Sequence, residues 1–178
     1  MSVIAKAPPF LRRDVIVDVP PSEVITMLAE TTTPERRTVG FGTEPDPVSD
    51  RVALVGAVGL FLYLYRRGYP ARLHVQSLGS DGGHDLAACG LTIDVKASQF
   101  DGPLGGCRLF VKEHELEGEV PDVYWQVFVH CLDQEDQHVH VATWIRTDDP
   151  VWIAATKNIQ PIPGAGSPGV VLPLSDCH

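Results

Sequence analysis

The sequence predicts an α/β domain with a central mixed β-sheet flanked by helices. Two observations carry this prediction. Residues 50–67 form an apolar run of helical length, and beyond residue 71 the pattern changes to short apolar or alternating segments separated by Gly, Pro and Asp clusters. The length of 178 residues suits one domain, and a content of 44% hydrophobic residues suffices for a core.

We expect this single domain to have its core at about residues 50–150. An N-terminal extension, residues 1–49, includes a short edge-strand candidate at 15–17 between two proline pairs. The tail, residues 156–178, is rich in Pro and Gly, and we expect it to be mostly coil with one strand near 170–172.

The helix at 50–67 should be buried on one face of the sheet. Ser49 is a suitable N-cap, and Gly68 is a suitable residue to end the helix. The sequence VALVGAVGLFLYLY is apolar on every side, as in a helix inside a fold, and Gly56 and Gly59 would allow close approach to the sheet. The run is shorter than the roughly 20 residues of a membrane span, so we expect no membrane association.

Beyond the helix, the period-two and apolar segments predict a series of strands. Residues 112–122 are charged, and we expect them to form an exposed connection. The predicted strands cover residues 72–78, 84–88, 91–98, 107–111, 123–132 and 138–145.

The charge balance limits the function classes. Against 14 Lys and Arg stand 23 Asp and Glu, and the net charge of -9 argues against a protein that coats nucleic acid by bulk charge. It leaves room for a metal that neutralises carboxylates locally. The four cysteines are scattered without a CxxC pair, which favours a reducing, cytoplasmic setting over a disulfide framework.

The segment around residues 91–98 is the most informative for chemistry, because its apolar and polar residues alternate without interruption. With a two-residue turn at 89–90, Asp85 lies opposite Asp94, at a Cβ separation of about 4.5–5.5 Å, and Lys96 shares their face. Two opposed carboxylates repel each other unless a cation lies between them. The pattern therefore predicts a cation site on the hairpin.

Oxygen ligands of this kind suit Mg²⁺ or Mn²⁺, with water and phosphate completing the shell. Such an ion would bind phosphodiester oxygens and lower the pKa of a bound water. Lys96 would orient or activate that water and stabilise the charge that develops on phosphorus. The carbonyl of Val95 is a candidate third ligand.

Asp85, followed nine residues later by Asp94-Val95-Lys96, resembles the PD-(D/E)xK nucleases, the restriction-endonuclease-like superfamily. The segment GGHDLAACGLTIDVKAS is similar to the hairpin of small prokaryotic and phage members. The order of elements over about residues 50–150 extends the resemblance, with a helix, the hairpin, an apolar strand VYWQVFVHCL and the return strand HVHVATWI.

This resemblance implies a restriction-endonuclease-like core and a metal-dependent deoxyribonuclease that hydrolyses the phosphodiester bonds of DNA. It assigns Asp85 and Asp94 as metal ligands and Lys96 as the catalytic lysine. Gln126 matches a polar position that some members place beside the metal. Whether two copies pair as a homodimer to cut both strands stays open.

Further candidates surround this motif. His84 and Ser98 are accessory candidates, His84 because it adjoins Asp85 and would reach a phosphate. The arginines proposed to contact the DNA backbone are Arg66, Arg67 and Arg72.

One departure from the family supports an alternative function. Many relatives carry a glutamate in the middle of the preceding helix, where this sequence has Leu60. The alternative is a catalytically weakened nuclease-fold protein that acts as a nucleic-acid-binding or assembly component.

A second alternative is a zinc-binding module. His138 and His140 share one strand face, and His130 would lie nearby across the turn. Trp125 and Trp144, on adjacent strands, are expected to be core residues and not a surface for base stacking.

Overall fold

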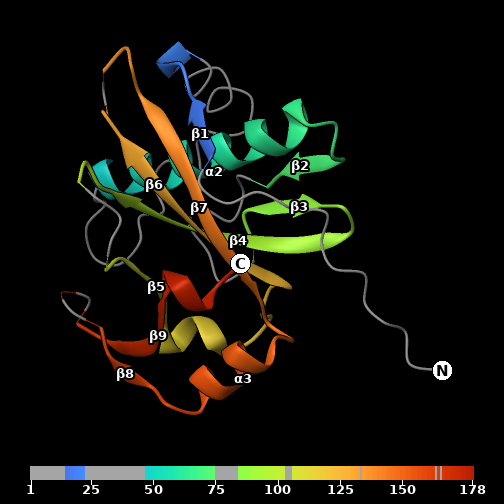
Figure 1. Cartoon of the computed structure of the whole chain (residues 1–178), viewed down its shortest axis with the longest axis vertical. Helices are drawn as coiled ribbons and strands as arrows, with labels where there is room; N and C mark the ends of the chain where they lie inside the picture. The colour runs from blue at the N-terminus through green and yellow to red at the C-terminus, as the bar shows by residue number, and fades with distance from the viewer. Residues whose placement is uncertain are drawn as a thin grey trace.

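The computed structural model describes residues 15–22, 47–74, 84–102, 106–132, 134–162, 164 and 166–178. Within these ranges the chain forms a large sheet and a small sheet, which follow one another along the long axis of the molecule (Figure 1). The predicted α/β class is confirmed. The second half of the expected strand at 72–78 lies outside the described residues.

The large sheet has six strands and is mixed, as predicted. Only β4 and β6 run parallel; the other neighbours are antiparallel. In spatial order the strands are β1 (Val15–Asp18), β7 (His138–Arg146), β6 (Val123–His130), β4 (Leu91–Gln99), β3 (Leu86–Ala88) and β2 (Ala71–Leu73).

The chain leaves the large sheet after β4 and returns at β6, and this excursion contributes one part of the lower half of the molecule in Figure 1; the rest of that half follows β7. The predicted strand at 107–111 therefore belongs to a second sheet and not to the central one. This small sheet has the order β5 (Arg108–Lys112), β9 (Pro168–Pro173) and β8 (Gln160–Pro161). Short helices accompany it: η3 (Glu113–Leu116), α3 (Pro150–Thr156) and η4 (Leu174–Asp176).

Helix α3 was not predicted, although its start carries a recognisable signal. Asp149 is the N-cap and accepts a hydrogen bond from the backbone N–H of Val151, and Pro150 occupies the first turn. Trp152 on this helix is buried, and its ring lies 4.8 Å from that of Tyr124. The helix thereby closes the core under the small sheet.

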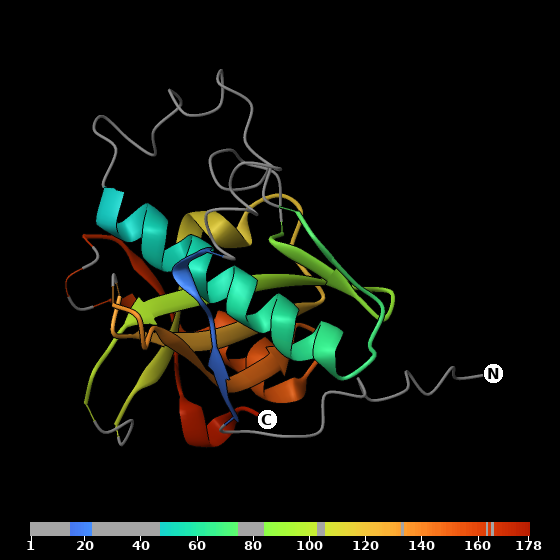
Figure 2. The ribbon, with the colours of Figure 1, turned by 90° about the horizontal axis from the view of Figure 1, so that it is seen from above.

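Helix α2 (Pro47–Arg66) crosses one face of the large sheet (Figure 2). Gly68, with a φ of 77°, follows its end, close to the predicted boundary, whereas the helix begins before the predicted N-cap Ser49. The approach is close at two glycines. A Cβ on Gly56 would lie 2.6 Å from the Cβ of Ala97, and one on Gly59 would lie 2.5 Å from Cγ2 of Val139. These positions therefore require glycine for packing, as the sequence predicted.

We expect Gly59→Ala to destabilise the protein by about 1–3 kcal/mol, because overpacking against Val139 outweighs the better helix propensity of alanine. Urea unfolding measures the change. The double variant Gly59→Ala/Val139→Ala removes the clashing side chain, so its loss should be smaller than the sum of the two single losses. Additive losses would contradict the clash.

Two hydrophobic clusters lie on the two faces of the large sheet. The first lies between α2 and the sheet and includes the predicted core residues Trp125 and Trp144, both buried, with rings 6.2 Å apart. The second joins Tyr124 and Ile145 to the small sheet and to Trp152. Since side chains alternate along a strand, the polar residues of β4 face the second side, toward the small sheet.

No helix in the described ranges is long and apolar enough to cross a membrane.

Candidate active site

The hairpin of β3 and β4 has the predicted two-residue turn. Cys89 and Gly90 have φ values of 53° and 80°, the pair of positive values that a type I′ turn needs. Ala88 pairs with Leu91, and the register continues from there through two further pairs. The predicted alignment of the hairpin is confirmed, with Asp94 and Lys96 on one face of the sheet and Ile93 and Val95 in the core.

The ladder of this hairpin stops at Asp85. The backbone N–H of Val95 donates a hydrogen bond to Oδ2 of Asp85 at 2.8 Å. In a continued antiparallel ladder, residue 84 would accept that bond, so the Asp85 side chain takes the place of the strand. β3 therefore begins at Leu86, later than the predicted start of the strand at 84.

Asp85 and Asp94 nevertheless lie together. Burial, the largest influence, raises the pKa of Asp94, and the neighbouring Asp85 side chain is close enough to act against it. A strand residue directs its N–H and C=O to the same neighbour, so the Val95 carbonyl points to the edge where Asp85 binds the Val95 N–H. The two predicted carboxylates and the predicted main-chain ligand share one edge.

Lys96 lies between two carboxylates, only one of which was predicted. Its Nζ is 3.0 Å from Oδ2 of Asp94 and 2.7 Å from Oε1 of Glu115. Only 17% of the Lys96 side chain is exposed. Burial alone would lower the pKa of Lys96, but Asp94 and Glu115 outweigh it and raise the pKa, so the side chain stays a cation.

Glu115 is the functional candidate that sequence reasoning missed. It lies on η3, in the segment expected to be an exposed connection, yet its carboxylate is largely covered by the site. Its Oε2 accepts a hydrogen bond from the backbone N–H of Lys112 at 2.8 Å. Burial raises the pKa of Glu115, but Lys96 and this hydrogen bond prevail and lower it, so Glu115 is ionised at neutral pH.

Asp94 has the opposite shift. Burial is the largest influence and raises the pKa of Asp94; Lys96 lowers it and the Glu115 carboxylate raises it again. The Lys96 ammonium is 5.6 Å from the centre of the Tyr124 ring, whose phenol stays neutral because burial raises its pKa. The carboxylates of Asp94 and Glu115 therefore share the buried Lys96 ammonium, which lies near the Tyr124 ring.

Gln126 and Ser98 lie beside this cluster. Gln126 is the register partner of Lys96 across β4 and β6, and its side chain is almost completely buried. Its Nε2 donates to Oγ of Ser98 at 3.3 Å and to the carbonyl of Val127 at 3.0 Å. Gln126 thus lies beside Lys96 on the neighbouring strand and is hydrogen-bonded to Ser98, the next residue on the same face of β4.

His84 lies next to a second histidine that sequence reasoning did not single out. Its ring is 4.8 Å from that of His74, and the backbone N–H of His74 donates to the carbonyl of Asp85 at 2.7 Å. Burial, His84 and Arg72 all lower the pKa of His74, in that order, which favours a neutral ring. The structure therefore places an imidazole pair beside Asp85.

The three candidate arginines are not brought together. Arg72 pairs with Ala87, which pairs with Thr92, so Arg72 faces the same side as Asp94. Arg66 and Arg67 follow α2 on the opposite face, and the Arg67 guanidinium lies 4.7 Å from the centre of the Tyr63 ring. Only Arg72 is on the side of the site.

The helix position at which many PD-(D/E)xK nucleases carry a glutamate also lies on the opposite face. Leu60 is fully buried in the cluster between α2 and the sheet. Asp94 and Lys96 point away from that cluster, toward the small sheet. An acid at position 60 would lie in an apolar core, so a carboxylate from another element would have to serve this site.

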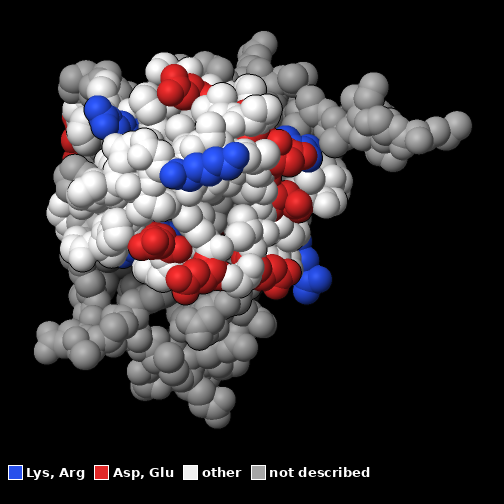
Figure 3. All heavy atoms as spheres, turned by 90° about the horizontal axis from the view of Figure 1, so that it is seen from below, with Lys and Arg blue, Asp and Glu red and all other residues white. Residues whose placement is uncertain are grey.

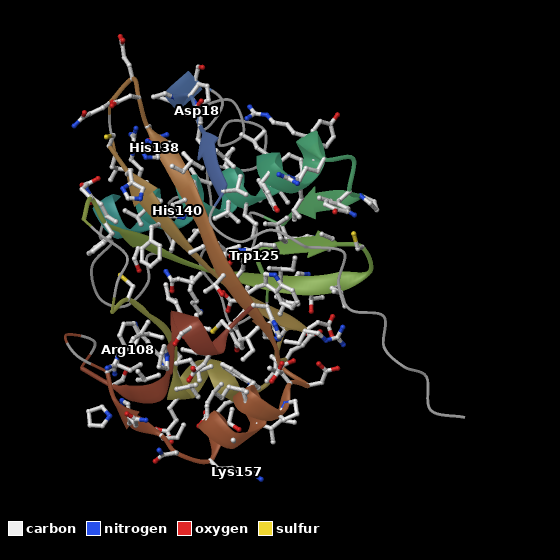
Figure 4. The ribbon with its side chains drawn as sticks, viewed as in Figure 1. Asp18, Arg108, Trp125, His138, His140 and Lys157 are labelled. Atoms are coloured by element: carbon white, nitrogen blue, oxygen red, sulfur yellow. The ribbon has the colours of Figure 1, made fainter. Side chains whose placement is uncertain are left out.

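The three histidines of the zinc hypothesis do come together, at one end of β6 and β7 (Figure 4). The His130 and His138 rings stack 4.8 Å apart, and the His140 ring is 6.2 Å from that of His130. His130 also lies 3.6 Å from Oδ1 of Asp101, and burial is the largest influence that lowers its pKa.

Within the described part of the chain, no group of three or more His, Cys, Asp or Glu side chains is arranged to hold a metal ion. This finding gives no support to the zinc module. The magnesium site predicted from the sequence uses two carboxylates and the Val95 carbonyl, and so does not depend on such a group.

Comparisons with family models, curated proteins and solved structures give no match for this chain.

Proposed function

We propose that this protein is a metal-dependent deoxyribonuclease that hydrolyses phosphodiester bonds. The observation that carries the proposal is the cluster around Lys96, whose ammonium contacts Asp94 on β4 and Glu115 on η3, with Asp85 beside Asp94. Three half-buried acids around one lysine suit phosphoryl chemistry better than a structural ion pair alone, which needs only one acid.

In this proposal Asp85, Asp94 and the Val95 carbonyl hold Mg²⁺ or Mn²⁺. When bound, the ion neutralises charge on the phosphate and lowers the pKa of a water molecule. Lys96 is a cation with a raised pKa, so it acts as a hydrogen-bond donor and not as a base. It orients the attacking water and stabilises the negative charge that develops on the phosphate oxygens.

Glu115 holds Lys96 from the side opposite Asp94, and its own orientation is fixed by the backbone N–H of Lys112. In the proposed enzyme it takes over the electrostatic role of the acid that relatives carry on the helix. This assignment explains how the site operates with leucine at position 60.

The surface charge is consistent with recognition at a local site. On the face seen from below, acidic side chains form groups among scattered basic ones (Figure 3), and the net charge of the chain is -9. DNA would therefore gain little from bulk attraction, and binding would depend on local contacts, to which the cation and Arg72 would each contribute.

One observation favours the alternative, a weakened nuclease-fold protein that serves as a nucleic-acid-binding or assembly component. The Lys96 ammonium already pairs with both Asp94 and Glu115, so these side chains hold together without any metal. In that function the cluster would stabilise the contact between the large sheet and η3.

Cleavage of plasmid and of single- and double-stranded oligonucleotides in Mg²⁺ or Mn²⁺ tests the proposal. We expect cleavage that EDTA abolishes, and a loss of about 100-fold or more in Asp94→Asn, since the variant loses a charged ligand of the proposed metal ion. Asp148→Asn, an exposed aspartate paired with Arg146, is the matched control and should cleave like the wild type.

If the wild type cleaves no faster than Asp94→Asn, the hydrolase proposal fails. Retained binding of oligonucleotides in the same preparation would then favour the alternative.

A further inference from the structure

A half-open pocket of about 360 Å³ lies between the large and small sheets, beside the candidate site. Its walls carry three phenylalanines: Phe100 directly after β4, Phe110 on β5 and Phe128 on β6. Phe128 is buried, the other two are half-buried, and the rings of Phe100 and Phe128 are 5.8 Å apart. Pockets of this volume accommodate small organic groups.

The pocket begins close to the proposed active site. Ser98, one of its lining residues, is two residues beyond Lys96 on the same face of β4, which corresponds to about 6.6 Å along the strand. Gln126 connects the two places, because it pairs with Lys96 and donates a hydrogen bond to Ser98. Phe128 is in turn the register partner of Ser98.

The lining favours a flat, aromatic group attached to an anion. Flat rings can stack on the faces of phenylalanine side chains, and this stacking does not depend on the hydrogen-bonding groups of the ligand. Arg108 is exposed at the pocket (Figure 4), and a guanidinium binds phosphate oxygens. Ser98 and Gln160 add polar groups that suit the edge of a heterocycle. A nucleotide has all of these features in one molecule.

We propose that this pocket receives one nucleobase of a single-stranded or locally unpaired nucleic acid, next to the phosphodiester held at Lys96. The inference rests on the proposed nuclease function and specifies its substrate class. A base inside a duplex is stacked and paired, so it cannot enter a pocket until it is extruded. Single strands should therefore bind and be cleaved in preference to duplexes.

Binding measured without catalysis tests the inference. In EDTA, we expect the protein to bind a short single-stranded DNA carrying 2-aminopurine and to change the fluorescence of that base by stacking. Phe110→Leu keeps the apolar volume but loses the aromatic face, and it should weaken binding by roughly tenfold. Phe61→Leu, on α2 across the sheet, is the matched control and should bind like the wild type.

Three outcomes would contradict the proposed base-binding role of the pocket. They are equal affinity of Phe110→Leu and Phe61→Leu, equal affinity for duplex and single strand, and unchanged affinity when the reporter base is replaced by an abasic site. An RNA oligonucleotide of the same sequence shows which sugar the site accepts. Weaker binding by Phe110→Leu together with an inactive wild type would support the pocket and reject hydrolysis, so the two proposals can fail separately.

Discussion

Replacing Lys96 with methionine is expected to destabilise the folded protein by about 3–5 kcal/mol, since removing one partner of a buried ion pair leaves the other charge uncompensated. In this protein the substitution exposes two carboxylates to each other, because Asp94 and Glu115 both contact the Lys96 ammonium. Methionine keeps most of the apolar stem, so the loss reports the charge and not the packing.

Urea unfolding at neutral pH measures this loss. Lys157→Met, an exposed lysine after α3, is the control and should change stability by less than about 0.5 kcal/mol. Adding Glu115→Gln to Lys96→Met removes one of the two repelling carboxylates and should recover much of the loss. If Lys96→Met and Lys157→Met are equally stable, the three charges do not form the cluster.

The same contact predicts an alkaline transition. The pKa of Lys96 is higher in the folded state than in the unfolded chain, so its contribution is complete below about pH 10.4 and declines as pH rises toward the folded pKa. Lys96→Met should lack this part of the alkaline decline.

The Lys96→Met variant also probes the proposed cation site by a stability readout. With the ammonium removed, no positive side chain competes with Mg²⁺ or Mn²⁺ for the Asp94 carboxylate, which belongs to the proposed cation site with Asp85. We therefore expect millimolar Mn²⁺ to raise the melting temperature of Lys96→Met, and to have no such effect on Lys96→Met/Asp94→Asn/Glu115→Gln. Equal responses of the two variants would show that these carboxylates do not bind the ion.

The parts of the site that are local in sequence could be predicted. The two-residue turn at 89–90 follows from a glycine that tolerates positive φ, and the alternation of residues 91–98 then fixes which side chains share a face. These two local features suffice to place Asp94 and Lys96 beside Asp85. The turn and the alternation depend only on residues close together in the sequence, so they can be predicted without knowledge of the rest of the fold.

Glu115 could not be predicted by the same route. It is 19 residues from Lys96 along the chain, and the contact exists only because the chain leaves the large sheet after β4 and places η3 against the site. A charged segment such as 112–122 reads as an exposed connection unless its partner is known. The small sheet was missed for a related reason, since β5 pairs with β9, near the end of the chain.

The sequence also could not predict on which side of the sheet α2 lies relative to the site. A run that is apolar on every side gives no indication of which face meets the sheet. The structure sets Leu60 in the cluster with Val95 and Trp125, on the face away from Asp94. Whether an acid at this position would serve the site is therefore a question about packing, and it can be tested directly.

We expect Leu60→Glu to be strongly destabilising and to bring no gain in cleavage. A carboxylate in this apolar cluster has its pKa raised by about 3 units or more, which makes the variant about 3–4 kcal/mol less stable at pH 7.5 than at a pH near its unfolded pKa of about 4.3. The neutral isostere Leu60→Gln is the matched control, because its cost does not depend on this ionisation. The folded state of Leu60→Glu binds its proton more tightly than the unfolded state, so the stability difference between the two variants should widen from pH 4.5 to pH 7.5. A constant difference would mean that the carboxylate reaches solvent or the cluster of Asp94 and Lys96, and that α2 does not separate position 60 from the site.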